Sequence, residues 1–468
     1  MEIPNKPKVA LVNTPLIEGI GHHPLFPPLG LAYIAAVLEK NEFEVRIIDC
    51  PVYGINHDKL KLELASFNPA IVGVGSMTPT IESALKSARV AKEACPDTTV
   101  VMGGPHATFM GRQILSNEPA VDFVVRGEGE ETLLELAQKF LAKRSLEEVK
   151  GIVFRKDGQI VETPARPFIQ DLDALPRPAY HLLPIDMYRI HGRKLLPIMS
   201  SRGCPFQCSF CVASQMFGAG FRGRSPQNVL DELEWLRDEY GAEAVTFQDD
   251  TLTFSRKRIL DICDGILERD LRLAWGCGTR ADVVTKEVLG KMRKAHCNEV
   301  CFGVESGCQR IRDALKKKVT TEQCENAIKW AKEAGIFVTV SVILGYPGET
   351  KETLEQTLDF VRKVEPDDVY LCHATPYPGT ELRALVERNG WKMVEDWTLY
   401  NTMNPIFEDP LLPGEEITKM RKAFYSKFYS PKYVLRQFVK GYVKGNLYSK
   451  IMARTSANYL LWRIKSGG

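Results

Sequence analysis

The sequence predicts an α/β protein: a doubly wound, Rossmann-like parallel sheet, then a partial (β/α)6 barrel, then a helical C-terminal region. Two runs of alternating strand and helix patterns predict the first two parts, one over residues 7 to about 140 and one of six strand–helix units after about residue 191. An aromatic and basic composition sets the last part apart. We place domains at 1–145, 191–400 and 401–468, with a linker at 146–190.

In the first part, each apolar strand pattern is followed by an amphipathic helix pattern. Near-continuous apolar strands are typical of a parallel sheet with helices on both faces. Ligands of such sheets bind beyond the carboxyl ends of the strands. The expected strands are 8–15, 43–51, 69–77, 98–105 and 121–129, and the expected helices are 28–41, 57–68, 80–95 and 130–143.

Residues 146–190 do not continue this alternation of strand and helix patterns. A short hairpin with an Asp-Gly turn at Asp157 is followed by a proline-dotted connector. The second series begins after it, and six units instead of eight predict an open barrel. Its expected strands are 195–200, 242–248, 271–277, 298–304, 335–345 and 367–374, and its expected helices include 226–240, 255–270, 285–296, 321–334 and 351–364.

Composition describes a globular chain, with 44% hydrophobic and 26% charged residues. We find neither a signal peptide pattern nor an apolar run long enough to span a membrane, which predicts a cytoplasmic protein. We interpret nine of the twelve cysteines as buried reduced thiols. The net charge of +2 is uneven, since twelve Lys/Arg and no acidic residue follow Glu416, which leaves −10 on the rest.

The other three cysteines, Cys204, Cys208 and Cys211, lie in "SSRGCPFQCSFCVASQ", directly after the first barrel strand. Thiolates on a Gly/Pro-rich loop suit an iron–sulfur cluster or zinc. Structural zinc takes four protein ligands, and no fourth Cys or His follows at zinc-site spacing. Three thiolates on a four-iron cluster leave one iron open. The alternative is three incidental thiols, which the loop composition disfavours.

"CPFQCSFC", with Phe210 before the third cysteine, resembles the signature of radical S-adenosylmethionine enzymes. The resemblance implies that the three thiolates hold a 4Fe–4S cluster, whose open iron binds the methionyl amine and carboxylate. One electron from the cluster then cleaves S-adenosylmethionine to a 5′-deoxyadenosyl radical, so we expect an external donor such as flavodoxin or ferredoxin. The chemistry belongs to the cofactors, which the protein binds and orients.

The same resemblance implies roles for residues that end successive barrel strands. Gln248, Asp249 and Asp250 are candidates for the methionyl amine, although the family's usual Gly-Gly-Glu is absent there. A guanidinium suits a carboxylate, so Arg280 is implied at the methionyl carboxylate. The remaining candidates are Glu305 and Ser306 at the ribose, and Ile343 and Gly345 at adenine.

The first series resembles the cobalamin-binding domain that precedes the radical core in a large subfamily. Its candidate cofactor-binding residues are Thr14, Ser76, Thr78, Gly103, Gly104 and Glu128. The Asp-x-His-x-x-Gly motif that supplies a cobalt ligand elsewhere is absent, so we expect cobalamin without a protein histidine on cobalt. His22 and His23 lie in the first loop, and we interpret them as surface residues rather than cofactor contacts.

The basic aromatic tail has three interpretations: it caps the barrel, lies on an anionic membrane surface, or binds nucleic acid. Tyr448, Tyr459 and Trp462 beside many cations favour a peripheral membrane contact over nucleic acid. The implied function is C-methylation of a hydrophobic small molecule, a lipid or isoprenoid. The alternatives are cyclisation of a lipid or tetrapyrrole, tRNA modification, and a non-catalytic corrinoid carrier.

Overall fold

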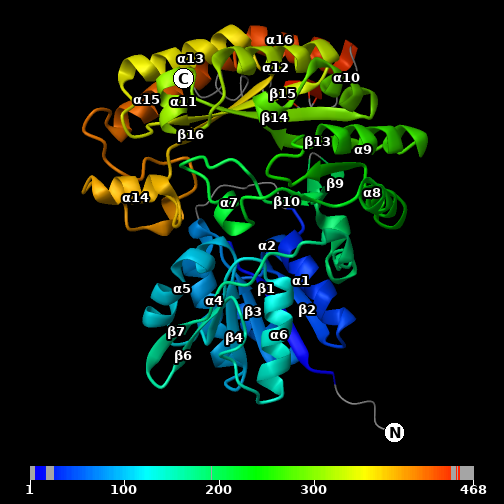
Figure 1. Ribbon diagram of the computed structural model, residues 1–468, viewed down its shortest axis with the longest axis vertical. Coiled ribbons are helices and arrows are strands. Elements are labelled where there is room, and N and C mark those ends of the chain that lie inside the picture. Colours follow the sequence, from blue (N-terminus) through cyan, green and yellow to red (C-terminus); the bar gives the residue numbers. More distant parts are fainter. Residues whose placement is uncertain (1–5, 17–25, 191, 444–448, 451, 454–468) are drawn as a thin grey trace.

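The protein has two mostly parallel sheets, one above the other, in the computed structural model (Figure 1). The structure describes residues 6–16, 26–190, 192–443, 449–450 and 452–453. His22, His23, Tyr448, Tyr459 and Trp462 lie outside these ranges. The expected fold class is confirmed: a doubly wound sheet, a six-stranded open barrel and a helical C-terminal region.

The first sheet has the order β2-β1-β3-β4-β5-β6-β7, with the first five strands parallel and the last two antiparallel. The order of the first five strands places the topological switch point, where ligands of such sheets bind, between β1 and β3. The strands are β1 Lys8–Asn13, β2 Glu44–Asp49, β3 Ile71–Gly75, β4 Thr99–Gly103, β5 Phe123–Val125, β6 Ile152–Lys156 and β7 Gln159–Glu162.

Helices cover both faces of this sheet. Helices α1 and α6 pack on one face, and α3, α4 and α5 pack on the other, each through its own apolar core. Two separate cores explain why the strands are apolar on both sides. The helices are α1 Leu29–Lys40, α2 Cys50–Tyr53, α3 His57–Phe67, α4 Ile81–Ala94, α5 Pro105–Asn117 and α6 Glu130–Leu141.

The hairpin of the expected linker is part of the first sheet. Strand β6 pairs antiparallel with β5, and β7 pairs with β6, so the sheet continues to Glu162. The segment from 163 to 188 then runs to the barrel without a helix of more than one turn. Composition alone did not reveal this, because an edge hairpin and a linker hairpin carry the same turn signal.

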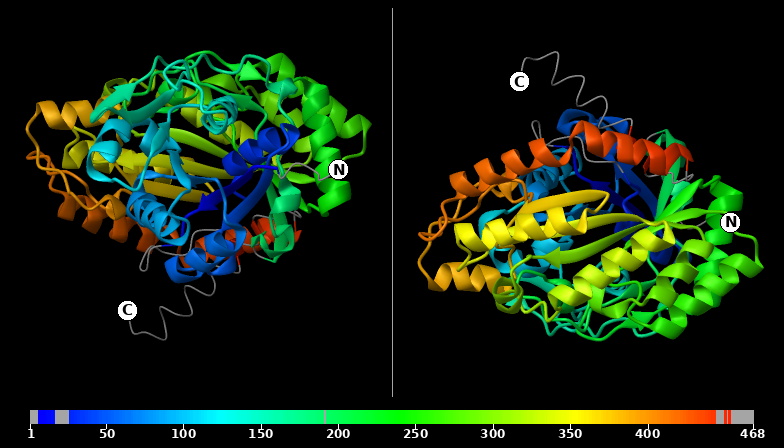
Figure 2. Two further views of the ribbon diagram at one scale, coloured as in Figure 1. Left: turned by 90° about the horizontal axis from the view of Figure 1, so that it is seen from below. Right: turned by 90° about the horizontal axis from the view of Figure 1, so that it is seen from above.

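The second sheet has the order β16-β15-β14-β13-β12-β9-β8, and its six long strands are parallel. Strand β8 adds an antiparallel edge. Figure 2 shows this sheet curling, with helices on its outer side. The strands are β8 Arg189–Ile190, β9 Arg193–Ile198, β12 Ala244–Phe247, β13 Ala274–Thr279, β14 Cys297–Glu305, β15 Phe337–Leu344 and β16 Asp368–His373.

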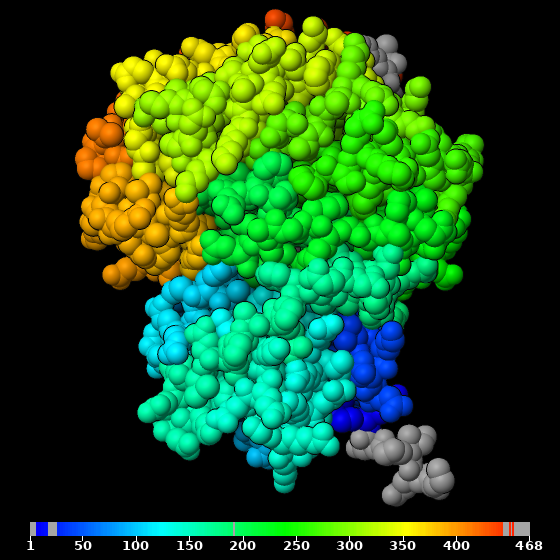
Figure 3. Space-filling view, in the orientation of Figure 1, coloured from blue at the N-terminus to red at the C-terminus, as the bar shows by residue number. Residues whose placement is uncertain are grey.

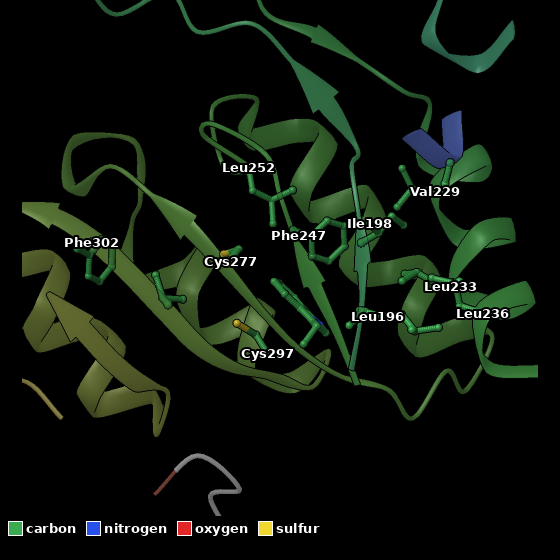
Figure 4. Close-up of a cluster of buried hydrophobic side chains, with 14 of the residues drawn as sticks. Leu196, Ile198, Val229, Leu233, Leu236, Phe247, Leu252, Cys277, Cys297 and Phe302 are labelled. Atoms are coloured by element: carbon green, nitrogen blue, oxygen red, sulfur yellow. The ribbon is translucent and has the colours of Figure 1, made fainter. Parts of the chain in front are cut away.

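Cap residues define the outer helices. Ser225 and Gly241 bound α8, and a Thr320–Gln323 capping box begins α12. Figure 4 shows Leu233 and Leu236 of α8 packed toward the strands. The helices are α7 Ala213–Met216, α8 Pro226–Tyr240, α9 Arg256–Glu268, α10 Lys286–Lys294, α11 Gln309–Ala314, α12 Thr321–Ala334, α13 Lys351–Val364 and α14 Glu381–Arg388.

Helices α15 (Gly414–Phe428) and α16 (Pro431–Phe438) pack against the barrel edge at β16. The Tyr433 hydroxyl donates to the Asp367 carbonyl, and the Gln437 amide donates to the Asp367 carboxylate. The described part of the C-terminal region therefore caps the barrel. Within the described residues, no helix is both long and apolar enough to cross a bilayer.

The twelve cysteines are all free thiols. Of the nine outside the cysteine triplet, seven are buried, and Cys301 and Cys372 are half-buried. This arrangement agrees with the interpretation of reduced thiols in apolar strands and helices.

Candidate active site

The three clustered cysteines lie on one loop, residues 203–212, which we call the cysteine loop. The loop begins with Gly203 at φ +84°, where a Cβ would stand 2.2 Å from the carbonyl oxygen of Gly220. Only glycine fits this close approach. Further along, the Ser209 amide donates to the Leu315 carbonyl at 3.0 Å, and the Ser209 and Tyr346 hydroxyls are hydrogen-bonded at 2.8 Å. The loop is thus fixed to the barrel.

Each of the three sulfurs has one polar neighbour in hydrogen-bonding reach. Cys204 Sγ is 3.9 Å from the Thr251 hydroxyl, Cys208 Sγ accepts from Arg280 Nη1 at 3.7 Å, and Cys211 Sγ accepts from the Ala213 amide at 3.4 Å. Donors to sulfur suit thiolates that ligate iron.

The donor set fits an iron–sulfur cluster better than a single metal ion. Among the described residues, no three His, Cys, Asp or Glu side chains converge as they would on one ion. A cluster spreads its thiolate ligands over several irons, so they need not converge. Burial raises the pKa of the Cys208 thiol and raises that of Cys211 to about 11, so both are protonated until a metal replaces the proton.

The three candidates after β12 separate into two groups. Asp249 is buried and accepts from the amide and hydroxyl of Ser200 and from the Ser201 hydroxyl. Its carboxylate therefore braces the segment that leads into the cysteine loop. Gln248 and Asp250 are exposed instead. Desolvation of the Asp250 carboxyl group by nearby protein atoms, together with the neighbouring Asp249 carboxylate, raises the pKa of Asp250 to about 6.

At the end of β14, Glu305 adopts φ +64°, a conformation that L-residues rarely take, at a register shift against β15. Its carboxylate pairs with Lys317 Nζ at 2.7 Å, with both side chains about 7% exposed. A Cβ at Gly303 would stand 2.4 Å from Glu305 Oε1, so glycine makes room for this pair. The Ser306 hydroxyl is hydrogen-bonded to Thr357 at 2.9 Å and faces α13.

Arg280, after β13, is only 5% exposed on its side chain. Its Nε and Nη2 donate to the two carboxylate oxygens of Asp282 at 2.9 Å each, and Nη2 also donates to the Lys317 carbonyl at 2.6 Å. The guanidinium carbon lies 3.6 Å from the centre of the Phe206 ring. The guanidinium is therefore held between the cysteine loop and the segment after α11.

At the end of β15, Ile343 and the following Tyr346 belong to one apolar cluster, against which the neighbouring Phe210 packs beside the cysteine loop. Gly345 has φ +78°, and a Cβ there would stand 2.5 Å from Ile417 of α15. The Glu349 carboxylate accepts from the Gly345 amide at 2.5 Å and shapes this turn.

Glu349 predicts a pH dependence of stability. Burial raises its pKa to about 7. Because this value lies above that of the unfolded chain, the stabilising contribution of the neutral carboxyl is complete below pH of about 4.5 and is lost as the pH rises through about 7. Glu349→Gln should therefore raise the free energy of unfolding by up to about 3 kcal/mol at pH 8 and by less than about 1 kcal/mol at pH 5.

Urea titrations at the two pH values measure this difference. Glu352→Gln, a change of an exposed side chain in the first turn of α13, is the control. It should change the free energy of unfolding by the same amount at pH 5 and at pH 8. Equal stabilisation by Glu349→Gln at pH 5 and pH 8 would contradict the prediction.

In the first domain, three candidate hydroxyls are already hydrogen-bonded internally. Thr14 Oγ1 is bonded to Ser83 and Ser87 of α4, Ser76 Oγ donates to the Gly103 carbonyl, and Thr78 Oγ1 is bonded to His106 Nδ1. They shape the carboxyl edge of the sheet by holding its loops together.

The glycines at the end of β4 differ from each other. A Cβ on Gly103 would meet no atom within 4 Å, so the backbone is open to a bulky group there. Gly104, at φ +95°, is required by its neighbour instead, since a Cβ would stand 2.6 Å from the Ser76 carbonyl oxygen. The open backbone at Gly103, on the carboxyl edge of the sheet, fits a large planar cofactor that approaches the backbone closely.

Glu128 connects the two domains. Its carboxylate pairs with Arg202 at 3.1 Å and with Arg222 at 2.9 Å, and Arg202 also pairs with Glu130. The four side chains are 3–8% exposed. Arg202 is two residues before Cys204, so a buried ion-pair network ties the cysteine loop to the carboxyl edge of the first sheet.

A second contact joins the domains farther out, where the chain on both sides of α14 meets α5; in Figure 3 the orange region lies against the blue first domain. The His106 ring lies 5.0 Å from that of Trp397, and a Cβ on Gly379 would stand 2.4 Å from Phe109. Burial, with a contribution from Arg383, lowers the pKa of His106 to about 4, so its ring is neutral at pH 7.

Sequence reasoning missed Arg202, Arg222, Lys317 and His106. Lys317 lies in the run "LKKKV", which reads as a solvated charge run, yet it is buried. The one local signal was the position of Arg202 directly before the Gly-Cys pair. The others depend on partners far along the chain.

An open parallel barrel with a three-cysteine loop after its first strand, tied to a doubly wound domain, is the architecture of a radical S-adenosylmethionine enzyme with an N-terminal cofactor domain. Two family models match accordingly: the radical SAM superfamily over residues 198–361 and the B12 binding domain over residues 23–137.

An uncharacterized methyltransferase of Pyrococcus horikoshii, PH0819, is 37% identical over 86% of this chain and 87% of its own. The anaerobic magnesium-protoporphyrin IX monomethyl ester cyclase of Rubrivivax gelatinosus is 34% identical over 86% and 74%, and the hopanoid C-3 methylase of Methylococcus capsulatus is 25% identical over 86% and 76%. The chain belongs to the cobalamin-dependent radical S-adenosylmethionine enzymes. Its cofactors are a 4Fe–4S cluster, S-adenosylmethionine and cobalamin.

Solved structures share the fold. The radical S-adenosylmethionine methyltransferase TsrM from Kitasatospora setae, with cobalamin and a [4Fe-4S] cluster bound, superposes with a TM-score of 0.74 at 18% identity, over 92% of this chain and 90% of TsrM. The cobalamin-dependent enzyme OxsB gives a TM-score of 0.68 at 20% identity, over 90% and 61%.

Proposed function

We propose that this enzyme methylates an unactivated carbon of a small molecule with a hydrophobic body, a lipid or isoprenoid. The observation that carries the proposal is the Glu128–Arg202 network, which holds the cysteine loop against the carboxyl edge of the first sheet. Such an arrangement keeps the two cofactor sites close enough to act on one substrate.

When bound, the cluster with S-adenosylmethionine supplies hydrogen abstraction, and cobalamin supplies a transferable methyl group. Cys204, Cys208 and Cys211 hold the cluster. Gln248 and Asp250 are available to the methionyl amine, since both are exposed while Asp249 is not. We assign Glu305 to the ribose, Ile343 and Gly345 to adenine, and Gly103 to cobalamin. A flavodoxin or ferredoxin supplies the electron.

Alternation along the barrel strands indicates which side chains face the barrel interior, where we place the substrate. On β14, Val300, Phe302 and Val304 pack toward the helices, so the alternate residue Cys301 faces the interior. On β16, Tyr370 alternates with the helix-packed Val369 and Leu371 and is 52% exposed. The names of the hopanoid methylase and of PH0819 support methyl transfer, and the cyclase at 34% identity supports cyclisation as the alternative.

The product distinguishes the two reactions. Reconstituted enzyme, S-adenosylmethionine carrying a deuterated methyl group, and a reductant are incubated with an isoprenoid lipid extract. Methylation predicts a lipid with added deuterium and the formation of S-adenosylhomocysteine. Cyclisation predicts loss of hydrogen without label. A protein that binds cobalamin but forms no deoxyadenosine would be a carrier and would overturn the proposal.

We further propose that the enzyme contacts membrane surfaces through α16. Leu435 and Phe438 of α16 are 64% and 51% exposed, and Val439 and Tyr442 of the π-helical turn that follows, Val439–Val443, are 41% and 42% exposed. Their spacing places them on one side, which we call the α16 stripe. The opposite side of α16 is anchored to Asp367. An exposed apolar stripe within a region rich in Lys and Arg suits an anionic bilayer.

The double change Leu435→Glu with Phe438→Glu should lower binding to phosphatidylglycerol vesicles at least about tenfold, because two apolar side chains no longer enter the bilayer. Vesicle cosedimentation measures this change. Leu62→Glu is the control, since Leu62 is 71% exposed on α3. Equal loss in the control, or wild-type protein that stays in the supernatant, would contradict the prediction.

A further inference from the structure

We propose that Arg280 is a positioning residue that raises the reduction potential of the cluster through Cys208, and that it does not bind the methionyl carboxylate. The proposal rests on the proposed function, because it requires the cluster to be held by the cysteine loop. It concerns a different property of the site, namely how easily the bound cluster accepts an electron.

The hydrogen bonds of Arg280 show why a carboxylate role is disfavoured. A guanidinium has five N–H donors. Four of them are in use: one on Nε and one on Nη2 to Asp282, a second on Nη2 to the Lys317 carbonyl, and one on Nη1 to Cys208. One N–H remains, whereas a fork-like grip on a carboxylate needs two. The bidentate partner of Arg280 is already Asp282.

The surroundings of the guanidinium point to the cysteine loop. Arg280 contacts that loop twice, at Cys208 Sγ and over the face of the Phe206 ring. Its side chain is 5% exposed, so solvent screens its charge little. Lys317, whose carbonyl accepts from Arg280, contributes little net charge here, because its ammonium is paired with the buried Glu305 carboxylate.

A buried positive charge and an N–H donor to a ligating sulfur both favour the cluster state that carries one more electron. Arg280 supplies both. Asp282 acts in the opposite direction, because its carboxylate, whose side chain is 15% exposed, offsets part of the Arg280 charge. We therefore expect the reduction potential of the cluster to shift in opposite directions when Arg280 and Asp282 are each replaced by a neutral residue.

The experiment compares Arg280→Gln and Asp282→Asn with wild-type enzyme after anaerobic reconstitution. Redox titration followed by electron paramagnetic resonance measures the midpoint potential, and equilibrium dialysis measures the dissociation constant for S-adenosylmethionine. Lys316→Gln is the control. It also removes a positive charge, from the residue next to Lys317, but the Lys316 side chain is 50% exposed. Iron content verifies that each protein holds the cluster.

In Arg280→Gln, the ratio of reduced to oxidised cluster at fixed ambient potential should fall about tenfold, which corresponds to about 59 mV for one electron. In Asp282→Asn the ratio should rise, in Lys316→Gln it should change less than twofold, and S-adenosylmethionine affinity should stay within about threefold throughout. An unchanged potential with tenfold weaker S-adenosylmethionine binding in Arg280→Gln would assign the carboxylate role and overturn the proposal.

Shifts of the same sign in Arg280→Gln and Asp282→Asn would also overturn it, since they would report a disturbed loop instead of charge. If Arg280→Gln binds no iron, the sign of the Asp282→Asn shift decides. A wild-type protein that binds no cluster overturns the proposed function itself, so the two failures are distinguishable.

Discussion

Alanine at any one of Cys204, Cys208 and Cys211 is expected to abolish both the iron–sulfur absorbance and the formation of 5′-deoxyadenosine. Three thiolates are the minimum that leaves one iron open while fixing the cluster, and the other nine cysteines lie outside the loop. Loss of one ligand therefore removes the cluster instead of weakening it. Iron content, absorption spectra and product analysis after anaerobic reconstitution measure the effect.

Cys95→Ala is the matched control for these variants, because Cys95 is a buried thiol of the first domain. This variant should retain iron and deoxyadenosine formation. Continued deoxyadenosine formation in a cysteine-loop variant, with wild-type iron content, would contradict the assignment of that cysteine as a ligand.

Glu128→Gln is expected to destabilise the folded enzyme by about 3–5 kcal/mol. The change leaves the Arg222 guanidinium buried without its carboxylate partner and leaves Arg202 with Glu130 alone. Removing one partner of a buried ion pair costs about this much, because the remaining charge stays out of water. Urea unfolding of the cofactor-free protein measures the loss.

Glu131→Gln is the control for Glu128→Gln. The Glu131 side chain is 54% exposed and 3.9 Å from Arg166, so its removal should cost at most about 1 kcal/mol. The comparison also tests the sequence-based expectation that Glu128 binds a cofactor. Unchanged stability together with a tenfold loss of cobalamin affinity would support cofactor binding and contradict an interdomain role.

Most of the fold was predictable because strand and helix patterns are local. The six barrel strands and the first five strands lie where alternating apolar segments placed them, and glycine and proline marked their ends. There are two exceptions in the first domain. Helix α5, Pro105–Asn117, was not among the expected helices. The β6–β7 hairpin was assigned to the linker, because its sequence looks the same whether it extends a sheet or stands in a linker.

The sequence predicted which strand ends carry the candidate site residues, but it did not predict in which direction their side chains point. Gln248, Asp249 and Asp250 are consecutive at one strand end, yet only Asp249 turns inward to Ser200 and Ser201. Alternation along an extended chain sends neighbours to opposite sides, but the sequence does not say which side the loop after the strand presents.

The sequence by itself determined three thiols on one loop at the end of a barrel strand. The resemblance of this loop and of the first βα series to known motifs indicated the family and its cofactors. The partners of Glu128, Arg280 and Glu305 were decided only by the tertiary structure. Glu128 meets Arg202 across 74 residues, and Arg280 meets Cys208 across 72. The physical reason is that the choice of partner for a buried charge depends on which distant side chains packing brings within hydrogen-bonding distance, and no local pattern encodes that.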